Sequence, residues 1–189
     1  QLGRPEDAER TMRESLNMYD RLMDTATPEQ RSQFEGAQGS VLNGLGLLLS
    51  RSRPREAIAF YTQSIELLDD ETGEEDWRLG RLQHNIGMCH YRLGNLDEAG
   101  DYLESSLQIK EAGLRRLRSE SSTAQEIDAG NRLQIATGKQ ALANVHFQME
   151  EYDQAEEDSF DDDVVVSPRS SASRSSGRPR PVFPSGSRY

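Results

Sequence analysis

The chain has 189 residues, of which 34% are hydrophobic and 29% charged, and its formal net charge is −11. This length suits one domain or a short repeat array, and the low apolar content argues against one large globular core. Residues 1–163 carry 33 acidic and 17 basic side chains, so we expect no nucleic-acid binding along this body. No apolar run approaches the roughly 18 residues of a membrane span, so no membrane partner is expected.

The first predicted element is a helix that follows the turn Gly3-Arg4-Pro5. Ala8, Met12 and Leu16 recur on one face of this helix, and proline is tolerated in a first helical turn. No helix precedes the turn, and the chain begins with Gln1 rather than Met. We therefore expect a fragment of a longer polypeptide, whose remainder would cover the exposed apolar face.

Three further stretches each predict a helix, a turn and a second helix. The first helices carry the stripes Val41/Leu42, Leu45 and Leu48/Leu49; Leu79, Leu82, Ile86, Cys89/His90 and Leu93; and Leu142, Val145/His146 and Met149. The second helices align on Ala57, Ala99 and Ala155, followed four residues later by Tyr61, Leu103 and Ser159 and seven residues later, in two copies, by Ser64 and Ser106. Small side chains at offsets 0 and 7 predict close approach of a neighbouring helix.

The third of the four aligned segments resembles the tetratricopeptide repeat. It reads Asn85-Ile86-Gly87, then Tyr91-x-Leu93-Gly94-Asn95-Leu96-Asp97-Glu98-Ala99. The resemblance implies an all-α fold, with antiparallel helix pairs stacked into a right-handed superhelix. It covers residues 1–158, about three and a half repeats with the first one incomplete, although Ala143 and Glu150 replace two glycines in the last copy.

The spacing between the aligned alanines exceeds the usual 34 residues of this family. The extra residues fall at Thr25–Gly39, Asp69–Asp76 and Arg115–Gly130, all of them polar stretches. We expect them to form lengthened helices and longer connections.

Residues 159–189 are expected to be a disordered tail, acidic at first and then rich in Ser, Arg and Pro. Three interpretations stay open for the part after Val164: an ordinary flexible tail, a truncated or frame-shifted reading frame, and a basic arm for an acidic partner or RNA.

The sequence offers no catalytic, cofactor-binding or metal-binding constellation, and we expect a chain that is not an enzyme. His90 and His146 occupy equivalent places and predict packing between paired helices rather than metal ligation. Cys89 predicts a buried thiol, and a single cysteine fits a reducing, cytoplasmic setting.

The resemblance implies a concave groove lined by the first helix of each pair, which binds a protein or a neutral to acidic peptide. The candidate partner-binding residues are Arg51, Arg81, His84, Met88, Tyr91, Arg92, Asn144 and Phe147. The other interpretation of these positions is an inner wall that simply tolerates polar side chains. The alternative function is a regulatory or sensor region of a larger signalling enzyme, such as a bacterial Ser/Thr protein kinase, with its catalytic domain outside this chain.

Overall fold

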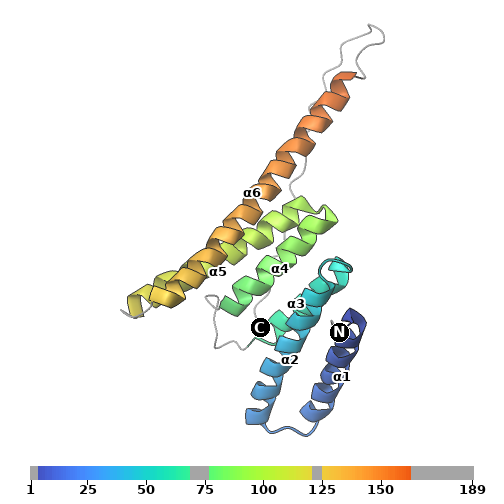
Figure 1. Ribbon diagram of the computed structural model, residues 1–189, viewed down its shortest axis with the longest axis vertical. Coiled ribbons are helices and arrows are strands. Elements are labelled where there is room, and N and C mark those ends of the chain that lie inside the picture. Colours follow the sequence, from blue (N-terminus) through green and yellow to red (C-terminus); the bar gives the residue numbers. More distant parts are fainter. Residues whose placement is uncertain (1–3, 69–76, 121–124, 163–189) are drawn as a thin grey trace, which may run out of the picture. The chain divides into compact units, whose positions relative to one another are not determined.

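The structure is a computed structural model that describes residues 4–68, 77–120 and 125–162, without the side chains of residues 119–128 and 155–162. It contains the helices α1 (Pro5–Met23), α2 (Pro28–Leu49), α3 (Pro54–Glu66), α4 (Trp77–Leu93), α5 (Leu96–Glu120) and α6 (Gln125–Asp162). The described residues contain no strand, so the fold is an all-α helical repeat (Figure 1). Compact units comprise residues 1–153 and 154–189, and the contacts described below lie in the first.

Local sequence signals set the helix ends. Proline opens α1, α2 and α3, where its missing N–H costs nothing because the first helical N–H groups have no partner within the helix. Thr27 caps α2 through a capping box with Gln30. Gly94 ends α4 with a φ of 79°, and the bonds from the Gly94 and Asn95 amides to the Tyr91 and His90 carbonyls form a Schellman motif.

The predicted helix pairs α2–α3 and α4–α5 are confirmed. Connections of four residues and of two residues join them, and short connections place paired helices antiparallel. Ala57 and Ala99, the aligned small residues, are fully buried in these pairs. Ala8, which aligns with them in α1, is exposed.

Each pair is closed by the same polar contact between its helices. Ser64 of α3 donates a hydrogen bond of 2.8 Å to the carbonyl oxygen of Gly39 in α2, and Ser106 of α5 donates one to Gly80 in α4. These are the serines at offset 7, buried to 3% and 1% exposure. The glycines leave room for the approach, because a Cβ at Gly80 would lie 3.1 Å from Lys110 Cγ.

The first hydrophobic core joins α2, α3 and α4. It comprises Leu42, Leu45, Leu49, Ala57, Phe60, Tyr61, Leu82, Ile86 and Cys89. Its members include the predicted stripes of α2 and α4, although Leu79 and Leu93 at the edges of the second stripe are only half-buried. Because α4 contributes to this core as well as pairing with α5, successive pairs are held by shared apolar burial.

Helix α6 packs against α5 through a second and a third cluster. Val145 joins Ala99 and Leu103 in the second, and Ile135 joins Leu107 and Leu114 in the third.

The prediction of a turn near residue 150, in the last copy of the repeat, is wrong. Helix α6 continues from Gln125 to Asp162 without interruption. The physical reason is local: Glu150 stands where the aligned copy has a turn glycine, and no Gly or Pro lies between residues 139 and 162. Within the described residues, no turn after His146 returns the chain as a paired helix, and His146 is exposed, contrary to the expectation for it.

The long spacings have a structural explanation. Helix α2 begins at Pro28, so most of Thr25–Gly39 is helical. Helix α5 ends at Glu120 and α6 begins at Gln125, so most of Arg115–Gly130 is helical as well. The period is lengthened chiefly by longer helices at these two places. Asp69–Asp76 and the tail from residue 163 lie outside the described residues.

Candidate functional site

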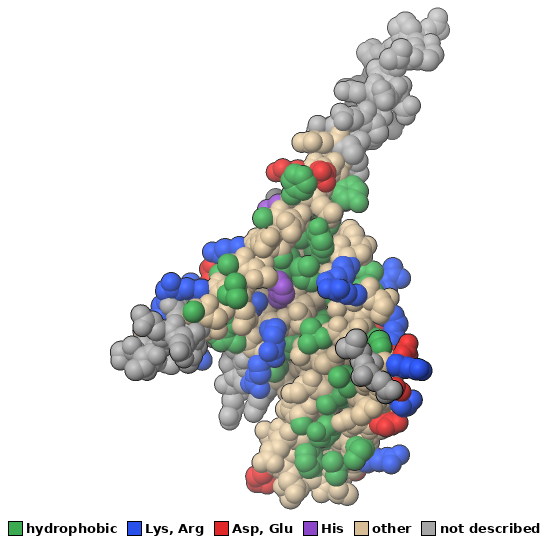
Figure 2. All heavy atoms as spheres, viewed as in Figure 1, with side chains coloured by type: hydrophobic (Ala, Val, Ile, Leu, Met, Phe, Trp, Pro, Cys, Tyr) green, Lys and Arg blue, Asp and Glu red, His purple; other side chains and the backbone are tan. Residues whose placement is uncertain are grey.

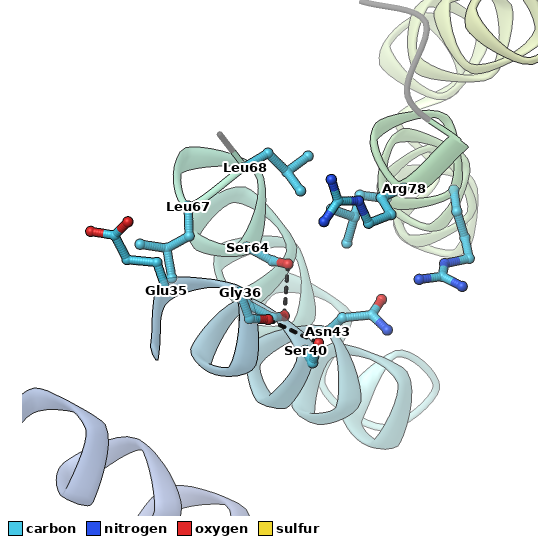
Figure 3. Close-up of a pocket in the computed structure, with 11 residues that line it drawn as sticks. Glu35, Gly36, Ser40, Asn43, Ser64, Leu67, Leu68 and Arg78 are labelled. Carbon is cyan, nitrogen blue, oxygen red and sulfur yellow. Dashed lines mark hydrogen bonds between the residues drawn. The ribbon is translucent and has the colours of Figure 1, made fainter. Parts of the chain in front are cut away.

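A groove lies between α2 and α4, over the C-terminal end of α3. It encloses a cavity of about 190 Å³. Its lining residues are Glu35, Gly36, Gly39, Ser40, Asn43, Ser64, Leu67, Leu68, Arg78, Arg81 and Leu82. Figure 3 shows side chains from α2 and α4 facing each other across this space, with the Ser64 hydrogen bond at its base. We call it the α2–α4 groove.

The floor of the α2–α4 groove follows from how the α2–α3 pair closes. The Ser64–Gly39 bond holds the end of α3 against α2, and Gly36 and Gly39 have no side chains to fill the space. Leu67 and Leu68, at the end of α3, supply an apolar surface beside it. A floor of this kind suits the apolar side chain of a bound segment.

Its polar groups come from both walls. Arg78 and Arg81 lie one helical turn apart on α4, and Glu35 lies on α2, so cations outnumber acids among the described lining residues. Asn43 Oδ1 is buried and has no hydrogen-bond partner. A buried acceptor without a partner costs roughly 1–3 kcal/mol, so a hydrogen-bond donor that reached this atom would be stabilising.

Seven of the eight predicted partner-binding residues, all but His84, fall into three environments. Arg81 lines the α2–α4 groove. Met88 and Tyr91 are half-buried against the second hydrophobic cluster, where they help to pack α6. The exposed ones outside the groove lining are Arg51, Arg92, Asn144 and Phe147.

His84 lies on α4 beside α5. Burial, and then the charge of Lys110, lower the pKa of His84 to about 4. Its Nδ1 is buried without a hydrogen-bond partner. Lys110 is itself only 3% exposed, and burial, and then the charge of Arg81, lower its pKa to about 8. The arrangement keeps His84 neutral near pH 7 and makes it a hydrogen-bonding group rather than a cation.

His84 and Asn43 occupy corresponding positions of their helix pairs. Each stands three residues before a buried glycine, Gly46 in α2 and Gly87 in α4, and each has a buried polar atom without a hydrogen-bond partner among the described residues. Both α2 and α4 therefore carry a buried side-chain atom that could form a further hydrogen bond.

Sequence reasoning missed Arg78, Glu35, Leu67 and Leu68 as lining residues. Arg78 precedes Arg81 by three residues, so helical spacing alone was a signal for it. The two leucines follow the aligned core positions of α3, and only the meeting of three helices shows that they border a cavity.

The remaining candidates for chemistry have structural environments. Cys89 is fully buried, as predicted, and burial raises the pKa of its thiol, which opposes reactivity. The ring of His90 stacks on Tyr102 of α5 at a centroid distance of 5.4 Å, consistent with packing between paired helices. Within the described residues, no three His, Cys, Asp or Glu side chains gather into a group suited to hold a metal ion.

Residues 80–112, which comprise most of α4 and the first two thirds of α5, match the family model described as the tetratricopeptide repeat. No curated protein sequence matches the chain. Among the helices in the described part of the chain, none has the length and apolar character required to cross a bilayer.

Proposed function

Because the chain contains a tetratricopeptide repeat, a module that typically mediates protein–protein interactions, we propose that it is a non-catalytic scaffold whose α2–α4 groove binds a peptide segment of a partner protein. The observation that carries this proposal is a groove whose lining brings together Arg81, an apolar floor and Asn43, whose buried Oδ1 has no hydrogen-bond partner among the described residues. The bound segment is neutral to acidic, since Arg presents a fork of donors that fits a carboxylate.

The electrostatics favour this class of ligand over a basic one. Arg81 lies in the lining of the cavity, in a chain whose net charge is −11. A segment with one carboxylate and one apolar side chain matches Arg81 and the floor formed by Leu67 and Leu68. The buried Cys89 thiol is compatible with the cytoplasmic setting expected for the scaffold.

The test uses peptides selected on the intact chain from a random 12-residue phage library. Their dissociation constants are measured by fluorescence anisotropy for wild type, Arg81→Ala and Asn43→Ala. We expect each substitution to weaken binding about tenfold, because a charge-assisted or a buried hydrogen bond is lost.

Arg55→Ala is the matched control, because Arg55 is exposed on α3 and lies outside the groove lining. It should bind as wild type does. Selected peptides that bind wild type, Arg81→Ala and Asn43→Ala with equal affinity would remove the α2–α4 groove as the binding site.

A further inference from the structure

Helix α1 has an exposed face whose residues recur every three or four positions, which places them along one side of the helix. The α1 face consists of Ala8, Thr11, Ser15, Met18 and Leu22. All are exposed except Ser15, which is half-buried, and Met18 is 64% exposed. The contacts of α1 with the first hydrophobic core come instead from Met12 and Leu16.

The same spacing forms the pairing side of α5, the second helix of its pair. The aligned residues of α5 are Ala99, Tyr102, Ser106, Ile109 and Gly113. Ser106 donates its hydrogen bond to Gly80 of α4, and a Cβ added at Gly80 would lie 3.3 Å from Ile109 Cγ2. The ring of Tyr102 stacks on His90 of α4. The α1 face therefore has the pattern by which α5 pairs with α4, but no helix among the described residues covers it.

Helix α6 has an exposed face with the same spacing. The α6 face consists of Leu133, Ala136, Gln140, Ala143 and Phe147. All five are exposed, and Leu133 and Phe147 are 68% and 61% exposed. Figure 2 shows hydrophobic side chains along the surface of α6. The other side of α6, with Gly138, Leu142 and Val145, packs against α5.

The residues of α4 that align with the α6 face are among those that meet α5. They are Trp77, Gly80, His84, Gly87 and Tyr91. A Cβ added at Gly87 would lie 2.9 Å from Leu103 Cγ of α5, and Tyr91 packs against the cluster that contains Ala99. The α6 face is therefore the pairing side of a first helix, and its exposure shows that no described helix is paired with it.

The two faces complement each other in an antiparallel arrangement. This arrangement places Ala8 opposite Phe147, Thr11 opposite Ala143, Ser15 opposite Gln140, Met18 opposite Ala136 and Leu22 opposite Leu133. Phe147 and Met18 each meet a small alanine, which favours close packing, and Ser15 and Gln140 can form a hydrogen bond. The register copies that of α4 and α5, where Ile109 lies against Gly80.

We propose that the α1 face of one copy docks on the α6 face of a second copy, as an intermolecular helix pair that repeats the α4–α5 contact. Within one copy α1 packs on α2 and α6 packs on α5, so neither face is used by a pair that the structure describes. A second copy is the favoured occupant, because its α1 already carries the order of side chains that the α6 face requires.

The two faces differ, so the contact is heterologous and joins copies head to tail, into a closed ring or a filament. It lies outside the lining of the α2–α4 groove and is independent of the function proposed for that groove.

Sedimentation velocity of the full chain, from about 1 to 100 μM, measures the self-association. Wild type should associate as its concentration rises. Met18→Glu and Phe147→Glu each place a charge on one face, and each should weaken association about tenfold or more, because docking would bury that charge without a partner. Both residues are exposed, and circular dichroism melting establishes that the variants are folded.

A mixture of the two variants distinguishes head-to-tail docking from contact between like faces. Met18→Glu keeps an intact α6 face, and Phe147→Glu keeps an intact α1 face. An equimolar mixture should therefore form a dimer that grows no further, although neither variant associates alone. If two α1 faces met each other instead, Phe147→Glu by itself would associate as wild type does.

Leu47→Glu on α2 is the matched control, because Leu47 is 55% exposed and lies outside both faces. It should associate as wild type does. Thr11→Trp and Ala143→Trp are a second pair of variants, which obstruct the faces by volume rather than by charge. Ala59→Trp, at an exposed position of α3, is their control.

Several outcomes would overturn the proposal. Wild type that stays monomeric at every concentration would leave the two faces to other segments of a longer polypeptide or to another protein. Association that Met18→Glu or Phe147→Glu leaves unchanged, or that Leu47→Glu abolishes, would place the contact elsewhere on the surface. An equimolar mixture of Met18→Glu and Phe147→Glu that stays monomeric would show that the α1 and α6 faces do not dock.

Discussion

Ser64 Oγ donates a hydrogen bond of 2.8 Å to the carbonyl oxygen of Gly39, and this bond joins the two helices of one repeat. The next repeat has the equivalent bond from Ser106 to Gly80. Both serines are buried, and each bond reaches a helical carbonyl rather than a free end. The same polar contact therefore sets how closely both helix pairs approach.

Ser106→Ala should lower the free energy of unfolding by about 1 kcal/mol, because it removes a buried hydrogen bond while keeping the small volume. Urea denaturation followed by circular dichroism at 222 nm measures the change. Ser32→Ala, at an exposed position of α2, is the control and should have little effect. Equal stability of wild type and Ser106→Ala would show that the bond contributes nothing to pairing.

Gly46→Ala should destabilise the protein by roughly 1–3 kcal/mol, because the added Cβ would lie 2.4 Å from Cε1 of Tyr61, a rigid ring in the core. The partner change Tyr61→Leu should recover part of the loss in the double variant, because a leucine side chain is smaller than the tyrosine ring and can shift away from the new Cβ. Gly36→Ala should have the opposite effect on the free energy of unfolding. No neighbouring atom lies within 4 Å of its new Cβ, so better helix propensity should stabilise by about 0.5–1 kcal/mol.

The network of Glu9 and Arg13 on α1 with Arg53 and Glu56 at the start of α3 should make stability depend on pH. Hydrogen bonds from Arg53 and then Arg13 lower the pKa of Glu9 below its usual 4.5. The unfolded chain therefore binds this proton more readily, and the stabilisation is present above pH 4.5 and lost as pH falls through the lowered value.

Glu9→Gln should thus be less stable than wild type at pH 7, and the difference should vanish in acid. Urea midpoints across this pH range, repeated in 1 M NaCl, measure it, and salt should shrink the difference as well. Glu14→Gln, exposed on the same helix, is the control. A pH-independent difference between Glu9→Gln and wild type would contradict the ion-pair explanation.

His84 should make the folded state lose stability between pH 6.5 and about 4. Its folded pKa of about 4 lies below the usual 6.5, so in this window the unfolded chain binds the proton and the folded chain does not. The total effect approaches about 3 kcal/mol at the acid end. His84→Asn, which copies the equivalent Asn43, should remove this part of the pH dependence.

Urea midpoints of wild type and His84→Asn at several pH values measure that contribution by difference, which cancels the titration of carboxylates common to both. A histidine-specific NMR titration gives the pKa of His84 directly. Parallel stability curves for the two proteins, or an imidazole that titrates at pH 6.5, would show that burial beside Lys110 does not keep His84 neutral.

The candidate groove was only partly predictable. The resemblance to the tetratricopeptide repeat implied that Arg81 lies on the inner side of α4, and the structure has it lining the cavity. Met88 and Tyr91 lie on the same helix, yet they pack towards α6. Spacing along one helix cannot distinguish solvent from a neighbouring helix, because that depends on segments more than 40 residues away in the chain.

The amino-acid sequence by itself determined the helix pairs, their turns and their close contacts. Gly94 and Pro54 end or begin helices through their own backbone chemistry, and Ala57 and Ala99 recur at a spacing that only close helix pairing explains. These properties are local or periodic along the chain, so they can be recognised without knowing which other segments lie nearby in space.

Tertiary structure alone decided which residues meet across the pairs. It placed Lys110 near His84 and brought Leu68 and Asn43 into the lining of one cavity. The physical reason is that burial, desolvation and cavity shape arise from several helices packed together, and no one helix carries that information.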